Sequence, residues 1–178
     1  MNPTGTELYK PIERRILELL RENAGNVFHA YFDGEPVLLA NSLLPAIIVD
    51  LQRSEPLVAA TRQDKWRHTI TIKVAVDKMD DADMGQADGA DKIIPVPSVN
   101  TLRSLVFGRD STTSNYLDTS LIGILRRNMT MQGAVIDQNI TAEYGVNERP
   151  GFDNVNVVTS EVHLTLSVTE TLNVTDRT

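Results

Sequence analysis

A run of carboxylates between residues 78 and 92 is the part of this sequence best suited to chemistry. Carboxylate oxygens bind calcium, and an EF-hand loop needs oxygen ligands at positions 1, 3 and 5, glycine at position 6 and glutamate at position 12. Counting from Asp81, position 5 is Gly85 and position 12 is Lys92, so the spacing does not fit. We therefore expect no metal here and interpret the segment as a mobile acidic contact loop, with carboxylates at Asp80, Asp81, Asp83, Asp88 and Asp91.

The histidines and serines form no recognisable catalytic pattern. His68 begins one predicted strand and His163 lies on the polar face of another, so the two could meet if those strands were neighbours. A zinc site would still lack a third ligand. The sequence has no cysteine, no Gly-x-Ser-x-Gly motif and no phosphate-binding glycine loop. These observations predict a protein that is not an enzyme and that needs no cofactor.

One short segment combines positive charge with an aromatic ring, through Arg62, Lys65, Trp66 and Arg67. Such a patch can bind nucleic acid by charge and stacking. The chain as a whole, however, carries 24 acidic and 17 basic residues, a net charge of −7. Because phosphate binding needs clustered cations, we expect these four residues to face an acidic surface of a partner or of another subunit.

Length and composition indicate one globular domain covering residues 1–178, large enough to bury a core. The first residues do not resemble a secretion signal, and the longest apolar run, residues 43–49, is interrupted by Pro45 and is too short to span a bilayer. We expect a protein that is made in the cytoplasm and has no membrane partner.

Two long segments, residues 68–77 and 160–172, alternate strictly between apolar and polar residues. Successive side chains of a strand point to opposite sides of the sheet, so each segment has one apolar face and one threonine-rich face. This pattern predicts a sheet that is covered on one side only. The threonine-rich face, with His163 and Thr165 on it, is a candidate interface between subunits.

The remaining sequence supplies shorter elements. A helix is predicted from Pro11 to Asn23 because apolar residues recur at helical spacing. The other expected elements are strands at 27–32, 37–39, 46–51 and 134–144, a polar connection at 53–64, helices at 99–106 (with Ser98 as cap) and 121–125 (entered from Asp118 or Thr119), and a turn at 147–153. Their order predicts an α+β fold, with a mostly antiparallel mixed β-sheet flanked by a few α-helices.

The whole arrangement resembles the tail terminator proteins of long-tailed bacteriophages, which belong to the tail-completion and neck proteins. The similarity runs from the helix at 11–20 through residues 32–37, the short β run at 44–49, and the long strand at 67–78 with its acidic loop. It continues through Gly108-Arg109-Asp110, the helix at 121–126 and the closing strand at 161–172. Nearly the whole chain is covered, without a catalytic signature.

The resemblance implies a virion protein, assembled in the host cytoplasm, that forms a homohexameric ring. Such a ring ends the tail tube and joins the tail to the head-neck connector. Its partners would be further copies of the chain, the tail tube protein, the neck or connector protein and, in a contractile tail, the sheath. DNA would pass through the lumen without specific binding, because aspartates lining the lumen repel its phosphates.

Two other interpretations remain open at this stage. One is another phage neck or baseplate component, such as a head-completion or tail adaptor protein. The other, from a different class, is a small cytoplasmic enzyme that depends on a metal or a nucleotide.

Overall fold

The computed structural model describes residues 10–60, 63–81, 95–131 and 133–173. Seven strands form one mixed sheet in the order β1-β2-β3-β7-β5-β4, and β6 pairs with β7 next to β5. Only β1 and β2 run parallel. The helices and strands are α1 (Ile12–Asn23), β1 (Ala30–Asp33), β2 (Ala46–Ala60), β3 (Gln63–Asp77), α2 (Pro97–Phe107), α3 (Leu121–Arg127), β4 (Thr130–Met131), β5 (Ala134–Ile136), β6 (Thr141–Pro150) and β7 (Asn156–Asn173). The predicted α+β fold with a mostly antiparallel sheet is confirmed.

The antiparallel ladder between β3 and β7 is the centre of the sheet. It pairs Gln63 with Asn173 at one end and Asp77 with Thr159 at the other. The predicted apolar face of both strands is confirmed, because the following side chains are all at most 1% exposed: Ile70, Ile72, Val74, Val76, Val162, Leu164, Leu166 and Val168.

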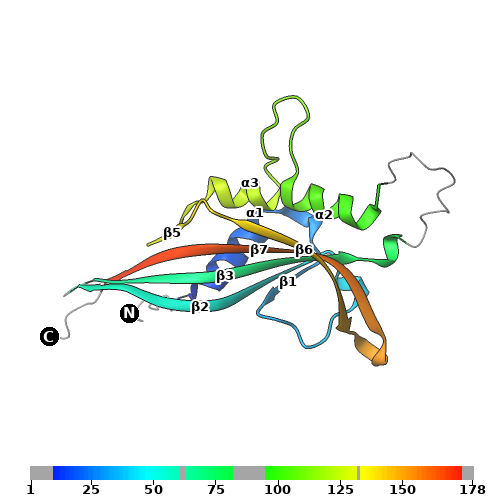
Figure 1. Cartoon of the computed structure of the whole chain (residues 1–178), viewed down its shortest axis with the longest axis horizontal. Coiled ribbons are helices and arrows are strands. Elements are labelled where there is room, and N and C mark those ends of the chain that lie inside the picture. The colour runs from blue at the N-terminus through cyan, green and yellow to red at the C-terminus, as the bar shows by residue number, and fades with distance from the viewer. Residues whose placement is uncertain (1–9, 61–62, 82–94, 132, 174–178) are drawn as a thin grey trace, which may run out of the picture.

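All three helices pack on this apolar face (Figure 1), since their buried residues join one apolar cluster with those of the two strands. In α1 the buried positions Ile12, Ile16 and Leu20 recur at helical spacing, as the sequence predicts, and the helix begins at Ile12, directly after Pro11. Burying a leucine or isoleucine side chain contributes about 1.5–3 kcal/mol. This layer therefore supplies most of the hydrophobic stabilisation.

Among the described residues, no α-helix packs on the opposite face of the sheet. A small second cluster, centred on Leu39, Leu44 and Val157, packs there against Ala46 and Ala75. It lies under the connection between β1 and β2, so that connection covers one end of the open face.

Several predicted boundaries are wrong, and the largest error concerns residues 53–64. This segment is not a polar connection: β2 and β3 continue through it as an antiparallel pair, from Glu55 opposite Arg67 to Ala60 opposite Gln63. Apolar and polar residues do not alternate there because both faces of the pair lie beyond the core. Residues 37–39 are also not a strand.

The end of the chain departs from the prediction in a simpler way. The single strand expected at 134–144 is two strands, β5 and β6, which pair with different parts of β7. The expected turn at 147–153 begins later, because β6 continues to Pro150 and β7 begins at Asn156. The cap of α3 is Ser120, whose hydroxyl accepts a hydrogen bond from the backbone N–H of Gly123, rather than Asp118 or Thr119.

Candidate functional site

The ends of β2, β3 and β7 form an arm, defined here as residues 54–60, 63–68 and 169–173, which extends beyond the helix layer (Figure 1). Lys65 and Arg67 are exposed on it and point to one side, whereas Trp66, half-buried, points to the other. The predicted basic and aromatic residues therefore share a strand without forming one patch. Arg62 lies outside the described residues.

His163 and Thr165 lie on the face of the sheet that no described α-helix covers. Thr165 is opposite Thr71 on one side and Thr141 on the other, which gives a row of three threonines across the sheet. His163 is opposite Lys73, whereas His68 is opposite Val168. The two histidines thus lie five positions apart along the ladder and on opposite faces, and the meeting considered from the sequence does not occur.

A buried ionic network on the same face centres on Glu161, which is fully buried. Arg149 donates two hydrogen bonds to its carboxylate, from Nε to Oε1 at 2.5 Å and from Nη2 to Oε2 at 3.0 Å. The Nε2 atom of His163 lies 2.8 Å from Oε2, and Asn147 and Thr159 also donate to the carboxylate. Such a forked arginine–carboxylate contact is among the stronger polar interactions in proteins.

The network lowers the pKa of Glu161 to about 2. Burial alone would raise this pKa, but the hydrogen bonds from Arg149, His163, Thr159 and Asn147 outweigh it. Arg149 also pairs with Glu35, which forms a second ion pair with Lys73. Partial burial would raise the pKa of Glu35, but these two contacts outweigh it and lower the pKa. Four elements are thereby tied together: the β1–β2 connection, β3, β6 and β7.

A second buried charge cluster lies where the arm meets α1. Arg15 pairs with Glu170, and the Nε2 atom of His68 lies 3.3 Å from Oε2 of the same carboxylate. On its other side, Nδ1 of His68 lies 2.9 Å from the hydroxyl of Ser54, an exposed residue of β2. The order serine–histidine–carboxylate is the one used by hydrolases, although here Glu170 is paired with an arginine. We assign the cluster a structural role, since it joins α1, β2, β3 and β7.

The first residues of the acidic segment, up to Asp81, are folded and do not belong to a mobile loop. Residues Met79–Asp81 form a 3-10 helix, and the carboxylate of Asp81 accepts hydrogen bonds from the backbone N–H and the hydroxyl of Ser98, both at 2.8 Å. Burial opposes the charge of Asp81, but Lys78 and Ser98 outweigh it and lower the pKa of Asp81. Asp80 belongs to the same short helix, and Asp83, Asp88 and Asp91 lie outside the described residues.

Ser98 is therefore not the helix cap that the sequence suggests. The residue before α2 is Val96, and Ser98 lies fully buried in the first turn of the helix. Its hydroxyl contacts Asp81 and, at 2.8 Å, the hydroxyl of Ser160 on β7. Asp81, which lies 17 residues earlier in the sequence, thus supplies the carboxylate that a helix N-terminus favours.

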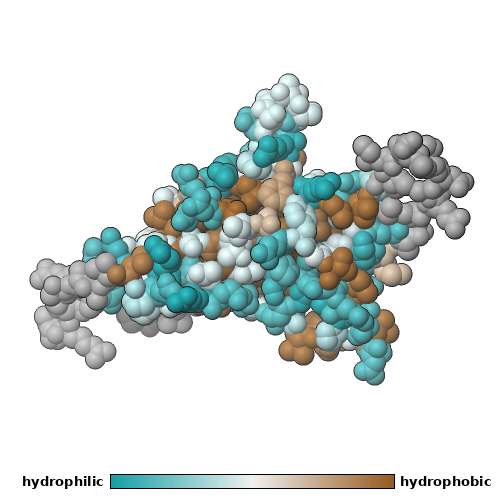
Figure 2. All heavy atoms as spheres, viewed as in Figure 1, coloured by the Kyte–Doolittle hydropathy of each residue, from teal (hydrophilic) through white to brown (hydrophobic). Residues whose placement is uncertain are grey.

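Two groups of apolar side chains are exposed in the structure. One is on β6, where Tyr144 and Val146 are 53% and 58% exposed. The other surrounds the turn between β6 and β7 together with the β1–β2 connection, and it comprises Val37, Leu38, Phe152 and Val155. Figure 2 shows apolar atoms on both sides of this turn, at the lower right of the view. Exposed apolar groups of this kind are typical of surfaces that bind other proteins.

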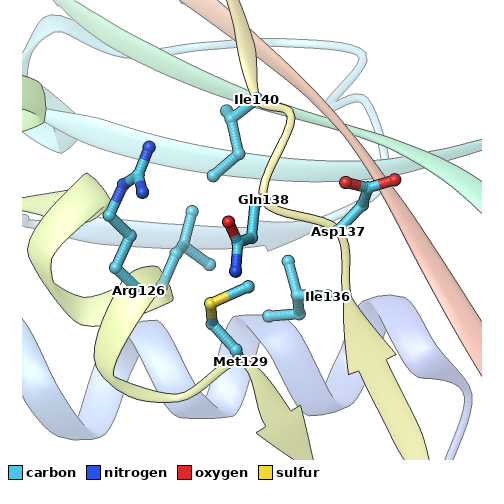
Figure 3. Close-up of a pocket in the computed structure, with 7 residues that line it drawn as sticks. Arg126, Met129, Ile136, Asp137, Gln138 and Ile140 are labelled. Carbon is cyan, nitrogen blue, oxygen red and sulfur yellow. The ribbon is translucent and has the colours of Figure 1, made fainter.

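A surface depression lies between the end of α3 and the β5–β6 connection. It is too shallow to enclose a water molecule. Figure 3 shows Gln138 among Met129, Ile136 and Ile140, with the carboxylate of Asp137 directed away. In the part of the chain that the structure describes, no three metal-ligating side chains come together. No described helix is both long and apolar enough to cross a bilayer.

The buried ion pairs could not be found from the sequence, because their members come from separate segments and a charge on a strand usually indicates a solvated face. The arm and the open face carry those candidate interface residues that the structure describes.

No protein-family model matches this chain, and no curated protein matches it.

Proposed function

We propose that the protein is a ring-forming virion subunit that ends the tube of a phage tail and joins the tail to the neck. The observation that carries this proposal is the arm. Its residues extend the sheet beyond the helices, and apart from His68 and Glu170 its described side chains are exposed or only half-buried. Because an extension of this kind buries little of its own surface, a neighbouring subunit is a natural surface for it to pack against.

Charge supports a contact between copies through this arm. Lys65 and Arg67 place two exposed cations on one side of it, in a chain whose net charge is −7. The cations of one copy would therefore meet an acidic surface of the next copy. A contact between two different surfaces is heterologous, and repeating it by rotation closes a ring.

The experiment is a charge reversal on the arm. Arg67→Glu should convert rings, seen by electron microscopy and by mass measurement in solution, into smaller species, because it places an acidic group against the acidic surface. Arg103→Glu is the matched control, since Arg103 is also exposed but lies on α2, away from the arm. The control should leave ring formation unchanged.

A binding assay separates this function from a related one. Rings that bind purified tail tubes and stop their growth support a terminator, whereas rings that bind only the head-side connector would assign the protein to the neck. A stable monomer that forms no ring and binds no tube would reject the proposal.

A further inference from the structure

The sheet has two long outer edges, on β2 and on β6, and they differ in how well they are protected from another strand. The edge of β2 is interrupted by Pro56 and by irregularities between Leu51 and Arg53 and between Pro56 and Val58. Proline and bulges are devices that natural proteins use to prevent a further strand from pairing with an edge. The edge of β2 is thus blocked along the arm.

The edge of β6 has neither device before its last residue. Its register with β7 runs without a break from Thr141, opposite Thr165, to Pro150, opposite Asn156. Among the described residues, β6 pairs as a strand only with β7, and at its end the carbonyl of Pro150 accepts a hydrogen bond from the backbone N–H of Leu39. Before Pro150, the other side of β6 presents backbone donors and acceptors outward. A strand of this length with an open side is a template for pairing with another chain.

The side chains of β6 make this strand complementary to itself. In an antiparallel pair of two copies centred on Gly145, Tyr144 of each copy lies opposite Val146 of the other. These two residues are more than half exposed, and Tyr144 stacks on Phe107 within its own copy. An aromatic residue opposite a β-branched one is a favourable cross-strand pair, and the two-fold symmetry supplies it twice.

The charges on β6 are also compatible with self-pairing. The same register puts Glu143 opposite Asn147 and Glu148 opposite Ala142, so no two like charges face each other. The guanidinium of Arg149 is already held by Glu161 and Glu35 in its own copy. We infer that β6 is a docking edge for a second copy of this chain, which adds its own β6 antiparallel about Gly145 and makes one sheet continuous across both copies.

This two-fold contact does not rest on the proposed function. A ring is closed by two different surfaces, whereas the β6 contact uses the same surface on both copies. Loss of one contact therefore leaves the other measurable.

A single cysteine provides the first test, because the native sequence has no cysteine. Gly145 is exposed and has no atom within 4 Å of an added Cβ, so Gly145→Cys fits the folded chain. Directly opposed residues of an antiparallel pair have Cα atoms about 4.5–5.5 Å apart, within the range of a disulfide. Mild oxidation should give a disulfide-linked dimer of Gly145→Cys, while the control Leu57→Cys on the edge of β2 should cross-link far more slowly. Equal cross-linking of the two variants would overturn the proposal.

A second pair of variants tests the contact without a covalent bond. Gly145→Lys places two like charges opposite each other on the two-fold axis, and it should raise the dimer Kd, measured by sedimentation, about fivefold. Gly145→Ala should keep the dimer, and circular dichroism should show both variants folded. A native protein that stays monomeric at high concentration would also overturn the proposal. If Gly145→Lys abolishes the dimer but rings still form, the two proposals are separated and both stand.

Discussion

The two faces of the β3–β7 ladder are built from the same two strands but are held in different ways. On the helix-covered face, every second residue of each strand is apolar and completely buried, and each such side chain adds its own hydrophobic contribution. On the opposite face, Glu161 is just as buried, yet it is held by hydrogen bonds and ion pairs. A buried ion pair adds little net stability, because desolvating the charges costs about as much as their attraction returns. The helix-covered face therefore stabilises the fold, while the opposite face fixes where the β1–β2 connection and the end of β6 lie.

The strongest test of this comparison places a charge on each face at neighbouring positions. Leu166→Asp puts a carboxylate into the apolar cluster, where Leu166 is 1% exposed, and it should prevent folding because its cost matches or exceeds the total stability of a domain. Thr165→Asp is the control on the open face and should cost about 1 kcal/mol or less. Circular dichroism and urea unfolding measure both, and similar losses would contradict the difference between the faces.

A smaller effect is expected from breaking the polar network. Arg149→Met leaves the carboxylate of Glu161 buried without its main partner, which should lower the free energy of unfolding by about 3–5 kcal/mol. The double variant Arg149→Met/Glu161→Gln should recover much of this loss, because no charge is then left without a partner. A double variant as unstable as the single one would show that packing of the arginine, rather than its charge, holds this face.

The smallest effect concerns pH. The pKa of Glu161 is about 2 in the folded protein, below its ordinary value of 4.5, so its charge stabilises the folded state above pH 4.5. That contribution, of up to about 3 kcal/mol, should be lost as the pH falls from 4.5 to 2. Urea unfolding across this range should show a steeper loss for the native protein than for Glu161→Gln. Parallel curves would mean that Glu161 does not carry the effect.

The helix-covered face could be predicted from the sequence, and the polar face could not. Alternation in the segments around Ile72 and Leu166 predicts which side chains are buried, and helical spacing in α1 predicts what covers them, because both patterns are local. The network around Glu161 depends on Glu35, Lys73 and Arg149, which meet only after the strands have paired. No local pattern marks such residues.

The arm could not be predicted from the sequence for a related reason. Pro56 and several charged residues make residues 53–64 similar to a loop, and these are the features that protect an exposed edge strand. Where a strand lies outside the core, burial no longer imposes an alternating pattern. The pairing of β2 with β3 then holds it in place instead.

The contact between Asp81 and Ser98 has a consequence for how the chain between them tolerates changes in length. The two hydrogen bonds from Ser98 to Asp81, together with the one between the hydroxyls of Ser98 and Ser160, hold the two ends of the intervening segment close together within the folded domain. The free energy of closing a loop whose ends are already fixed varies only with the logarithm of its length. Removing residues 86–89 should therefore change the stability of the domain by only a few tenths of a kcal/mol. Changes in the length or charge of this segment should therefore leave the sheet undisturbed.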